Sequence, residues 1–298
     1  MAEFLLQPLR GDYLSNQTPS PKIIWTSAKV ISVEGLNVIR SGKLVLEDVN
    51  LEINKGEFVG IVGPNGGGKT TLLMTILGIL QSSKGKIEVF GFNPYPTNFR
   101  GEIGWVSQTA ANIPTKMRMT VRELITMGTV SRIDWWPFSI RSKEKRERIE
   151  KAMELTGISH LANKDISRLS GGERQRAVIG RALASDAEVL IFDEPLVNVD
   201  RSARNGILKL LDTLCHEEGK TILMVSHDLA AIRQTAHRMI YLEESIRFDG
   251  MTEDFPDLST LAGLRGIEPV HGNADEKKEF SLTVNEIDTE DKTNQEGD

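Results

Sequence analysis

A glycine-rich segment between two apolar stretches limits this chain to few folds. Residues 63–71 read Gly-Pro-Asn-Gly-Gly-Gly-Lys-Thr-Thr and fit the pattern G-x-x-x-x-G-K-[ST]. Residues 57–62 before it are apolar enough for a buried strand, and residues 72–77 after it carry apolar side chains spaced for one helix face. A strand, a glycine loop and a helix start together aim backbone N–H groups at a phosphate chain. The segment therefore predicts a phosphate-binding loop.

The residue types in this loop suit that chemistry. Glycines permit positive φ and let the backbone approach phosphates closely. Lys69 would bring a compact charge to the β- and γ-phosphates, and the Thr70 hydroxyl is suited to ligate Mg²⁺. The pattern alone could be a glycine-rich turn, but the flanking strand and helix argue against that. The residues assigned to nucleotide binding are Gly63, Pro64, Asn65, Gly66, Gly67, Gly68, Lys69, Thr70 and Thr71.

Charge and cysteine content narrow the class of protein. The net charge is −6, and the acidic residues gather after residue 274, so the composition argues against a nucleic-acid binder. A single cysteine, Cys215, excludes an internal disulfide and fits a reducing compartment. No apolar run has the length of a membrane span, and no continuous apolar leader begins the chain. We expect a cytoplasmic protein.

Further along, Ser170 and Glu173 form the S-x-x-E pattern of a capping box, so a helix should begin there. Its free N–H groups, next to Gly171 and Gly172, could bind a second phosphate, although an ordinary capped helix is the simpler interpretation. Residues 142–156 read as another helix, with opposite charges four positions apart on a solvated face.

Two apolar strands end in polar residues that suit catalysis. Residues 188–192 lead to Asp193 and Glu194, and residues 221–225 lead to Ser226 and His227. Strands that alternate with helices predict a parallel α/β sheet, in which ligands sit at the carboxyl ends of the strands. Asp193 and Glu194 could instead be a solvated pair, and His227 a helix cap.

The order of these motifs resembles the nucleotide-binding subunit of the ATP-binding cassette (ABC) transporters. The order runs from the phosphate loop through Gln108, Leu169-Ser170-Gly171-Gly172-Glu173 and Asp193-Glu194 to His227, and the resemblance covers about residues 30–250. It implies a P-loop NTPase (RecA-like) α/β core with an antiparallel β subdomain and an inserted α-helical subdomain. The implied boundaries are an extension over 1–27, an ATPase domain over 28–250 with helices over about 109–170, and an acidic, disordered tail over 251–298.

The resemblance also implies a role for each matching residue, with ATP and Mg²⁺ as cofactors. Glu194 would be the general base, aided by Gln108 and His227. The ion would be held by Thr70, Gln108 and Asp193. The signature residues Ser170, Gly171 and Gly172, with Asp200, would close on ATP held by a second copy in a head-to-tail dimer. The family's adenine-stacking aromatic is absent, and Arg40 stands near its place.

Residues 119–128 and Trp135-Trp136 look like those of the prokaryotic metal-ion importers, so zinc, manganese or iron is the expected cargo. The resemblance implies a separate membrane permease, attachment to the inner face of the membrane through it, and indirectly an extracytoplasmic substrate-binding protein. Trp135 to Phe138 could dock a partner or pack within the helical subdomain. The alternatives are a siderophore or cobalamin importer, a non-transport ABC ATPase, and an inactive structural subunit.

Overall fold

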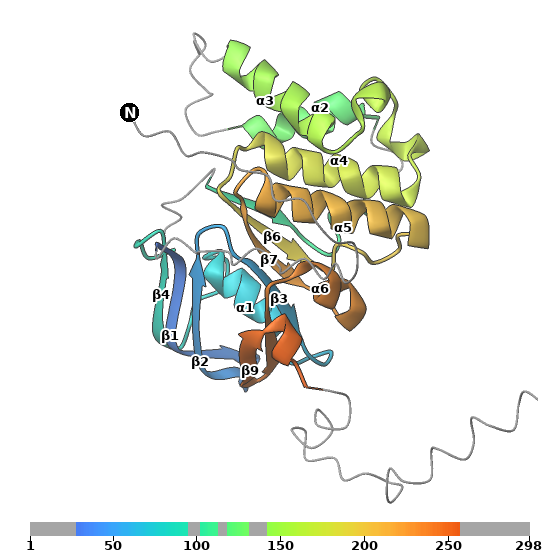
Figure 1. Cartoon of the computed structure of the whole chain (residues 1–298). Coiled ribbons are helices and arrows are strands. Elements are labelled where there is room, and N and C mark those ends of the chain that lie inside the picture. The colour runs from blue at the N-terminus through green and yellow to red at the C-terminus, as the bar shows by residue number, and fades with distance from the viewer. Residues whose placement is uncertain (1–27, 95–101, 113–117, 131–141, 257–298) are drawn as a thin grey trace, which may run out of the picture.

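A computed structural model describes residues 28–94, 102–112, 118–130 and 142–256 of the 298. They form two sheets, with helices packed on the larger one (Figure 1). The smaller sheet is antiparallel, in the order β2 (Lys43–Asn54), β1 (Lys29–Arg40) and β4 (Lys84–Val89). Ser41 and Gly42 have φ of 49° and 76° and join β1 to β2, so that Arg40 pairs with Lys43. Positive φ at both positions is what a two-residue hairpin turn requires.

The larger sheet has six strands, and its centre is made of buried strands. The order is β5 (Ile103–Val106), β6 (Val189–Asp193), β7 (Thr221–Val225), β3 (Phe58–Val62), β8 (Arg238–Glu243) and β9 (Ser245–Met251). Only β9 runs antiparallel to its neighbour. Every residue of β3, β6 and β7 is buried, because both faces of this sheet are covered, and that is why these strands read as unbroken apolar runs.

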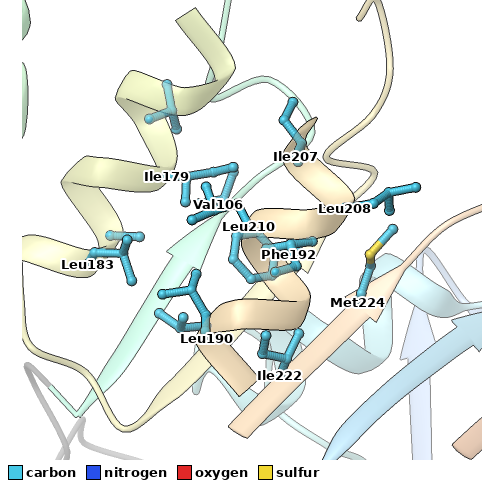
Figure 2. Close-up of a cluster of buried hydrophobic side chains, with 14 of the residues drawn as sticks. Val106, Ile179, Leu183, Leu190, Phe192, Ile207, Leu208, Leu210, Ile222 and Met224 are labelled. Atoms are coloured by element: carbon cyan, nitrogen blue, oxygen red, sulfur yellow. The ribbon is translucent and has the colours of Figure 1, made fainter. Parts of the chain in front are cut away.

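Each face of the central strands supports its own core. Val59 and Ile61 of β3 face α1 (Lys69–Ile76), which lies between the two sheets. Phe58 and Val62 face the opposite core, built with α4 (Gly171–Ala184), α5 (Arg201–His216) and α6 (Leu229–Thr235). Figure 2 shows part of the second core, where strand residues such as Phe192 and Met224 meet leucines and isoleucines of α4 and α5. The two cores hold the ends of β3, β6 and β7 in a fixed arrangement.

A helical layer lies above α4 in Figure 1. It contains α2 (Val121–Thr126) and α3 (Ser142–Leu155), both packed against α4. Short 3₁₀ turns complete the described structure: Met127–Thr129, Ser159–Leu161, Ile166–Arg168 and Thr252–Asp254. Residues 135–138, predicted either to dock a partner or to pack within the helical subdomain, lie outside the described residues.

The predicted α/β class, with its antiparallel sheet and inserted helices, is confirmed. Strands β8 and β9 were not predicted from the sequence. Residues 251–256, assigned to the tail, are folded, because Met251 ends β9 and Phe255 is buried against the core. The extension over 1–27 and the acidic residues after 256 lie outside the described residues.

Candidate functional site

The glycine loop joins the end of β3 to the start of α1. Gly63, Gly66 and Gly68 have φ of 151°, 82° and 94°. A Cβ on Gly63 would lie 2.0 Å from the Leu242 carbonyl oxygen, and a Cβ on Gly68 would lie 2.4 Å from the Leu46 side chain. Positive φ favours glycine at all three positions, and at Gly63 and Gly68 a side chain would also clash, so the loop keeps a path on which its N–H groups can approach a phosphate.

Gly67 is restrained on both sides. Its N–H donates to the Pro64 carbonyl at 3.1 Å, and its own carbonyl accepts the Glu244 N–H at 3.1 Å. A Cβ there would lie 2.9 Å from the Leu242 carbonyl oxygen. The small residue is needed because the β8–β9 turn packs directly on the loop.

Lys69 is the first residue of α1, and its ammonium group bends back into the loop. Its Nζ donates to the carbonyl oxygens of Gly63 and Pro64, each at 2.8 Å. Burial lowers the pKa of Lys69, while the nearby charges of Glu194 and Asp193 act in the opposite direction. The ammonium group is thus held inside the loop, where a phosphate oxygen would be a stronger partner than a neutral carbonyl.

The next residue, Thr70, points at the end of β6. Its hydroxyl donates to the carboxylate of Asp193, with oxygen–oxygen distances of 3.1 and 3.3 Å. Asp193 is buried, and desolvation raises its pKa, partly offset by the Thr70 hydrogen bond. A hydroxyl and a carboxylate oxygen are hard ligands of the kind that Mg²⁺ accepts together with phosphate and water. This pair fits a magnesium ion.

Glu194 follows β6, and the backbone turns sharply at this residue. Its φ is 54°, an uncommon value for a residue with a side chain, and its N–H donates to the Val225 carbonyl at 2.9 Å. The carboxylate is 10% exposed, and its Oε2 lies 2.8 Å from Nδ1 of His227. Because the carboxylate accepts, His227 carries a proton on Nδ1 in this contact. The His227 ring itself is 65% exposed, so it holds Glu194 while staying accessible.

The loop, Lys69, Thr70, Asp193 and Glu194 line one cavity of about 510 Å³, at the carboxyl ends of β3, β6 and β7. The predicted site residue His227 is absent from the described residues that line it and contacts the site through Glu194. Of the predicted site residues, the cavity wall contains Arg40, Asn65, Gly66, Gly68, Lys69, Thr70, Thr71, Gln108, Asp193 and Glu194. The wall also contains Ser41 and Val45, which the sequence analysis missed. Both belong to the β1–β2 hairpin, and no local pattern marks them, because only the packing of the hairpin over the loop brings them there.

The predicted capping box at the start of α4 is confirmed. The Glu173 N–H donates to the Ser170 hydroxyl at 3.2 Å, and the Ser170 N–H donates to the Glu173 carboxylate at 2.8 Å. A Cβ on Gly172 would lie 2.4 Å from the Ala203 side chain, so the first turns of α4 and α5 are in close contact. Asp200 caps α5 by accepting the Ala203 N–H at 3.0 Å.

Ser170, Gly171, Gly172 and Asp200 are absent from the described residues that line the cavity, and they lie together where α4 and α5 begin. Within the described ranges, no helix is both long and apolar enough to cross a bilayer.

The arrangement of the site suits chemistry on a phosphate chain. Thr70 and Asp193, with the magnesium ion that they fit, and the Lys69 ammonium can neutralise the charge of a bound phosphate chain. Glu194, which His227 contacts, can orient a water for attack on it.

Comparison with known proteins finds one matching family and similar ATP-binding proteins of transport systems. The family described as ABC transporter matches residues 46–197, from β2 to just beyond Glu194. The zinc uptake system ATP-binding protein ZurA of Listeria innocua is 33% identical over 227 residues, which cover 76% of this chain and 88% of that protein. The manganese transport system ATP-binding protein MntA of Synechocystis is 32% identical over 225 residues, which cover 75% and 85%.

A solved structure with a similar fold is also an ABC transporter cassette. A bacterial ABC transporter cassette, described as dimeric, superposes with a TM-score of 0.64 at 28% identity. The match covers 76% of this chain and 100% of that one.

Proposed function

Because the chain belongs to the ABC transporter family, as an ATP-binding and ATP-hydrolysing subunit, we propose that it powers the import of a metal ion through a separate membrane permease. One observation carries the ATPase part: the Lys69 loop, the Thr70–Asp193 pair and Glu194, which His227 contacts, line one cavity. The metal part is supported by relatives named for zinc and for manganese.

In this proposal each group has a separate task. Loop N–H groups and Lys69 bind the β- and γ-phosphates, and Arg40 packs its planar guanidinium against the base. Thr70 and Asp193, with Gln108, hold Mg²⁺, which adds charge neutralisation. Glu194 takes a proton from the attacking water, and the Nδ1–H of His227 holds the carboxylate that accepts it. Because phosphoryl transfer depends mainly on positioning and charge, no covalent intermediate with the protein is needed.

We infer a head-to-tail dimer from the position of Ser170, Gly171, Gly172 and Asp200 outside the cavity wall. In this arrangement they complete the nucleotide site of a second copy. Since the one cysteine, Cys215, is buried, introduced cysteines can be cross-linked with low background. A mixture of Asn65→Cys and Arg168→Cys chains should give linked dimers only with ATP, and failure to link the two chains would refute this arrangement.

The permease would hold the subunit at the inner face of the membrane and receive cargo from an extracytoplasmic binding protein. The expected cargo is zinc, manganese or iron, and siderophore or cobalamin import is the second candidate because it uses the same ATPase chemistry. Neither candidate requires a nucleic acid, and the chain's net charge of −6 does not favour one.

The deciding experiment is growth and metal uptake on limiting zinc, manganese or iron, with Glu194→Gln as the test variant. Gln keeps an oxygen for the His227 contact but cannot accept the water proton, so we expect bound ATP and a hydrolysis rate lowered by about 10²–10³-fold or more. Glu188→Gln, at the opposite end of β6, is the matched control and should behave like the original protein.

Growth failure with Glu194→Gln that one metal alone rescues would identify the cargo. Normal uptake of all three metals would reject metal import and leave the other importer classes. Normal ATP turnover would remove Glu194 from the role of base.

A further inference from the structure

The residue after His227 takes part in a charged contact that the proposed mechanism does not use. Arg204, in the first turn of α5, places Nη1 2.6 Å from Oδ2 of Asp228. Asp228 directly follows His227 in the sequence and is the N-cap of α6. The contact therefore joins the start of α5 to the short segment that carries His227.

The Asp228 carboxylate is fixed from two sides. Its Oδ1 accepts the Ala231 N–H at 3.1 Å, which caps α6, and its Oδ2 accepts Arg204. The Asp228 N–H donates to the Ser226 hydroxyl at 3.0 Å. With both carboxylate oxygens and the N–H engaged, the backbone on either side of His227 has little freedom. A helix cap alone would need only one of these oxygens.

The placement of Arg204 is unfavourable without its partner. A positive side chain near the N-terminal ends of α5 and α6 faces the positive ends of two helix dipoles. Its Nε is buried with no hydrogen-bond partner among the described residues. Asp228 offsets this cost, and because the Arg204 side chain is 40% exposed, the pair contributes more to geometry at this position than to stability.

The residue before Arg204 contacts α4, the helix that begins at the signature residues. Its own N–H donates to the Asp200 carbonyl at 2.9 Å, and the preceding Ala203 packs against Gly172 of α4. The contacts thus continue from Gly172 through the first turn of α5 to Asp228. From there His227 reaches Glu194, through Nδ1 at 2.8 Å and through its N–H at 3.4 Å.

We propose that Arg204 is a positioning residue for ATP hydrolysis: by holding Asp228 it sets the place of His227, and through His227 the orientation of the Glu194 carboxylate. This inference rests on the proposed function. It also means that a displacement of the first turn of α5 is transmitted to the Glu194–His227 pair. Arg204 is absent from the described residues that line the cavity, so it acts without contacting the nucleotide bound by its own chain.

The test is steady-state ATP hydrolysis by the full chain, with kcat and KM measured separately. Arg204→Met should lower kcat by about 10- to 100-fold, because small misplacements of reacting groups have effects of that size, while KM stays within about twofold. Arg204→Lys should recover part of the loss. Lys209→Met removes a positive charge from an exposed position of the same helix and should leave kcat unchanged.

A double-mutant cycle separates positioning from general destabilisation. If Arg204 acts through His227, then Arg204→Met adds no further loss to His227→Ala. Asp228→Asn, which keeps an oxygen for the Ala231 cap but loses the charge, should lower kcat like Arg204→Met and guards against a folding defect in either variant. An equal loss from Arg204→Met in both backgrounds, or unchanged kcat in Arg204→Met, would overturn the proposal. Absence of ATP hydrolysis in the original protein would reject the proposed function instead.

Discussion

Arg238, in β8 of the larger sheet, forms hydrogen bonds both to the smaller sheet and to the edge strand β9. Its guanidinium donates to the Glu52 carbonyl at 2.8 Å and to the Glu57 carboxylate at 3.1 Å, and it forms two parallel hydrogen bonds to Asp249. The side chains of Arg238, Glu57 and Asp249 are 20%, 5% and 28% exposed. We predict that Arg238→Met lowers the free energy of unfolding by about 3–4 kcal/mol, because removing one partner of a buried charge pair typically costs about 3–5 kcal/mol.

The estimate depends on the hydrogen-bond donors and the access to water that each carboxylate retains without Arg238. Glu57 retains one donor, the Asn54 N–H at 2.9 Å, but has almost no access to water. Asp249 is more exposed and can be rehydrated, which places the expected value in the lower part of the range. Most of the loss therefore comes from the uncompensated charge of Glu57, and the double variant Arg238→Met, Glu57→Gln should recover about 1–2 kcal/mol of it.

The assay is urea unfolding at neutral pH without nucleotide, followed by circular dichroism, with the m-values compared. Arg247→Met, at an exposed arginine of the neighbouring strand β9, is the control and should change the free energy of unfolding by less than about 0.5 kcal/mol. The reasoning would be refuted if Arg238→Met behaved like this control. It would also fail if adding Glu57→Gln made Arg238→Met less stable.

Three further predictions concern separate regions. Burial, and then His216, lower the pKa of His237, so the unfolded chain binds a proton more readily, and the free energy of unfolding should fall as pH drops below about 6.5. Urea titrations at several pH values check this, and His237→Gln should flatten the slope. Gly172→Ala should lower ATP turnover by pushing α4 away from Ala203, with recovery in the Gly172→Ala, Ala203→Gly double variant. A chain truncated after Val270 should hydrolyse ATP at the normal rate, and a collapse in turnover would assign the tail a role.

Motifs whose residues are adjacent in sequence could be recognised before the structure was known. The loop over 63–71, the Ser170–Glu173 capping box and the acids after β6 depend on local geometry: a turn that needs glycine, a helix start, a strand end. Their order along the chain also indicated the fold class. These patterns could be recognised because each is a short run of residue types that a local backbone geometry requires, even where its hydrogen bonds, as at Asp193, go to distant residues.

Contacts between distant segments could not be read in this way. Ser41 and Val45 reach the cavity only because the hairpin folds over the loop, and Arg204 meets Asp228 across two helices. The helix at 142–156 shows the same limit. Lys143 and Glu147 come together as their spacing predicts, at 3.9 Å, but other charges of this helix also pair outside it, as Lys151 does with Glu218.

The amino-acid sequence thus determined the chemistry of this protein: a phosphate loop, a carboxylate pair and a histidine at strand ends. Tertiary structure alone decided which groups share the cavity and which lie beside it. Ser170 and Lys69 both belong to predicted phosphate sites, yet only Lys69 lines the cavity. The physical reason is that local hydrogen bonds determine the backbone geometry of each turn. The packing of the two buried cores determines how far apart turns from distant parts of the sequence lie.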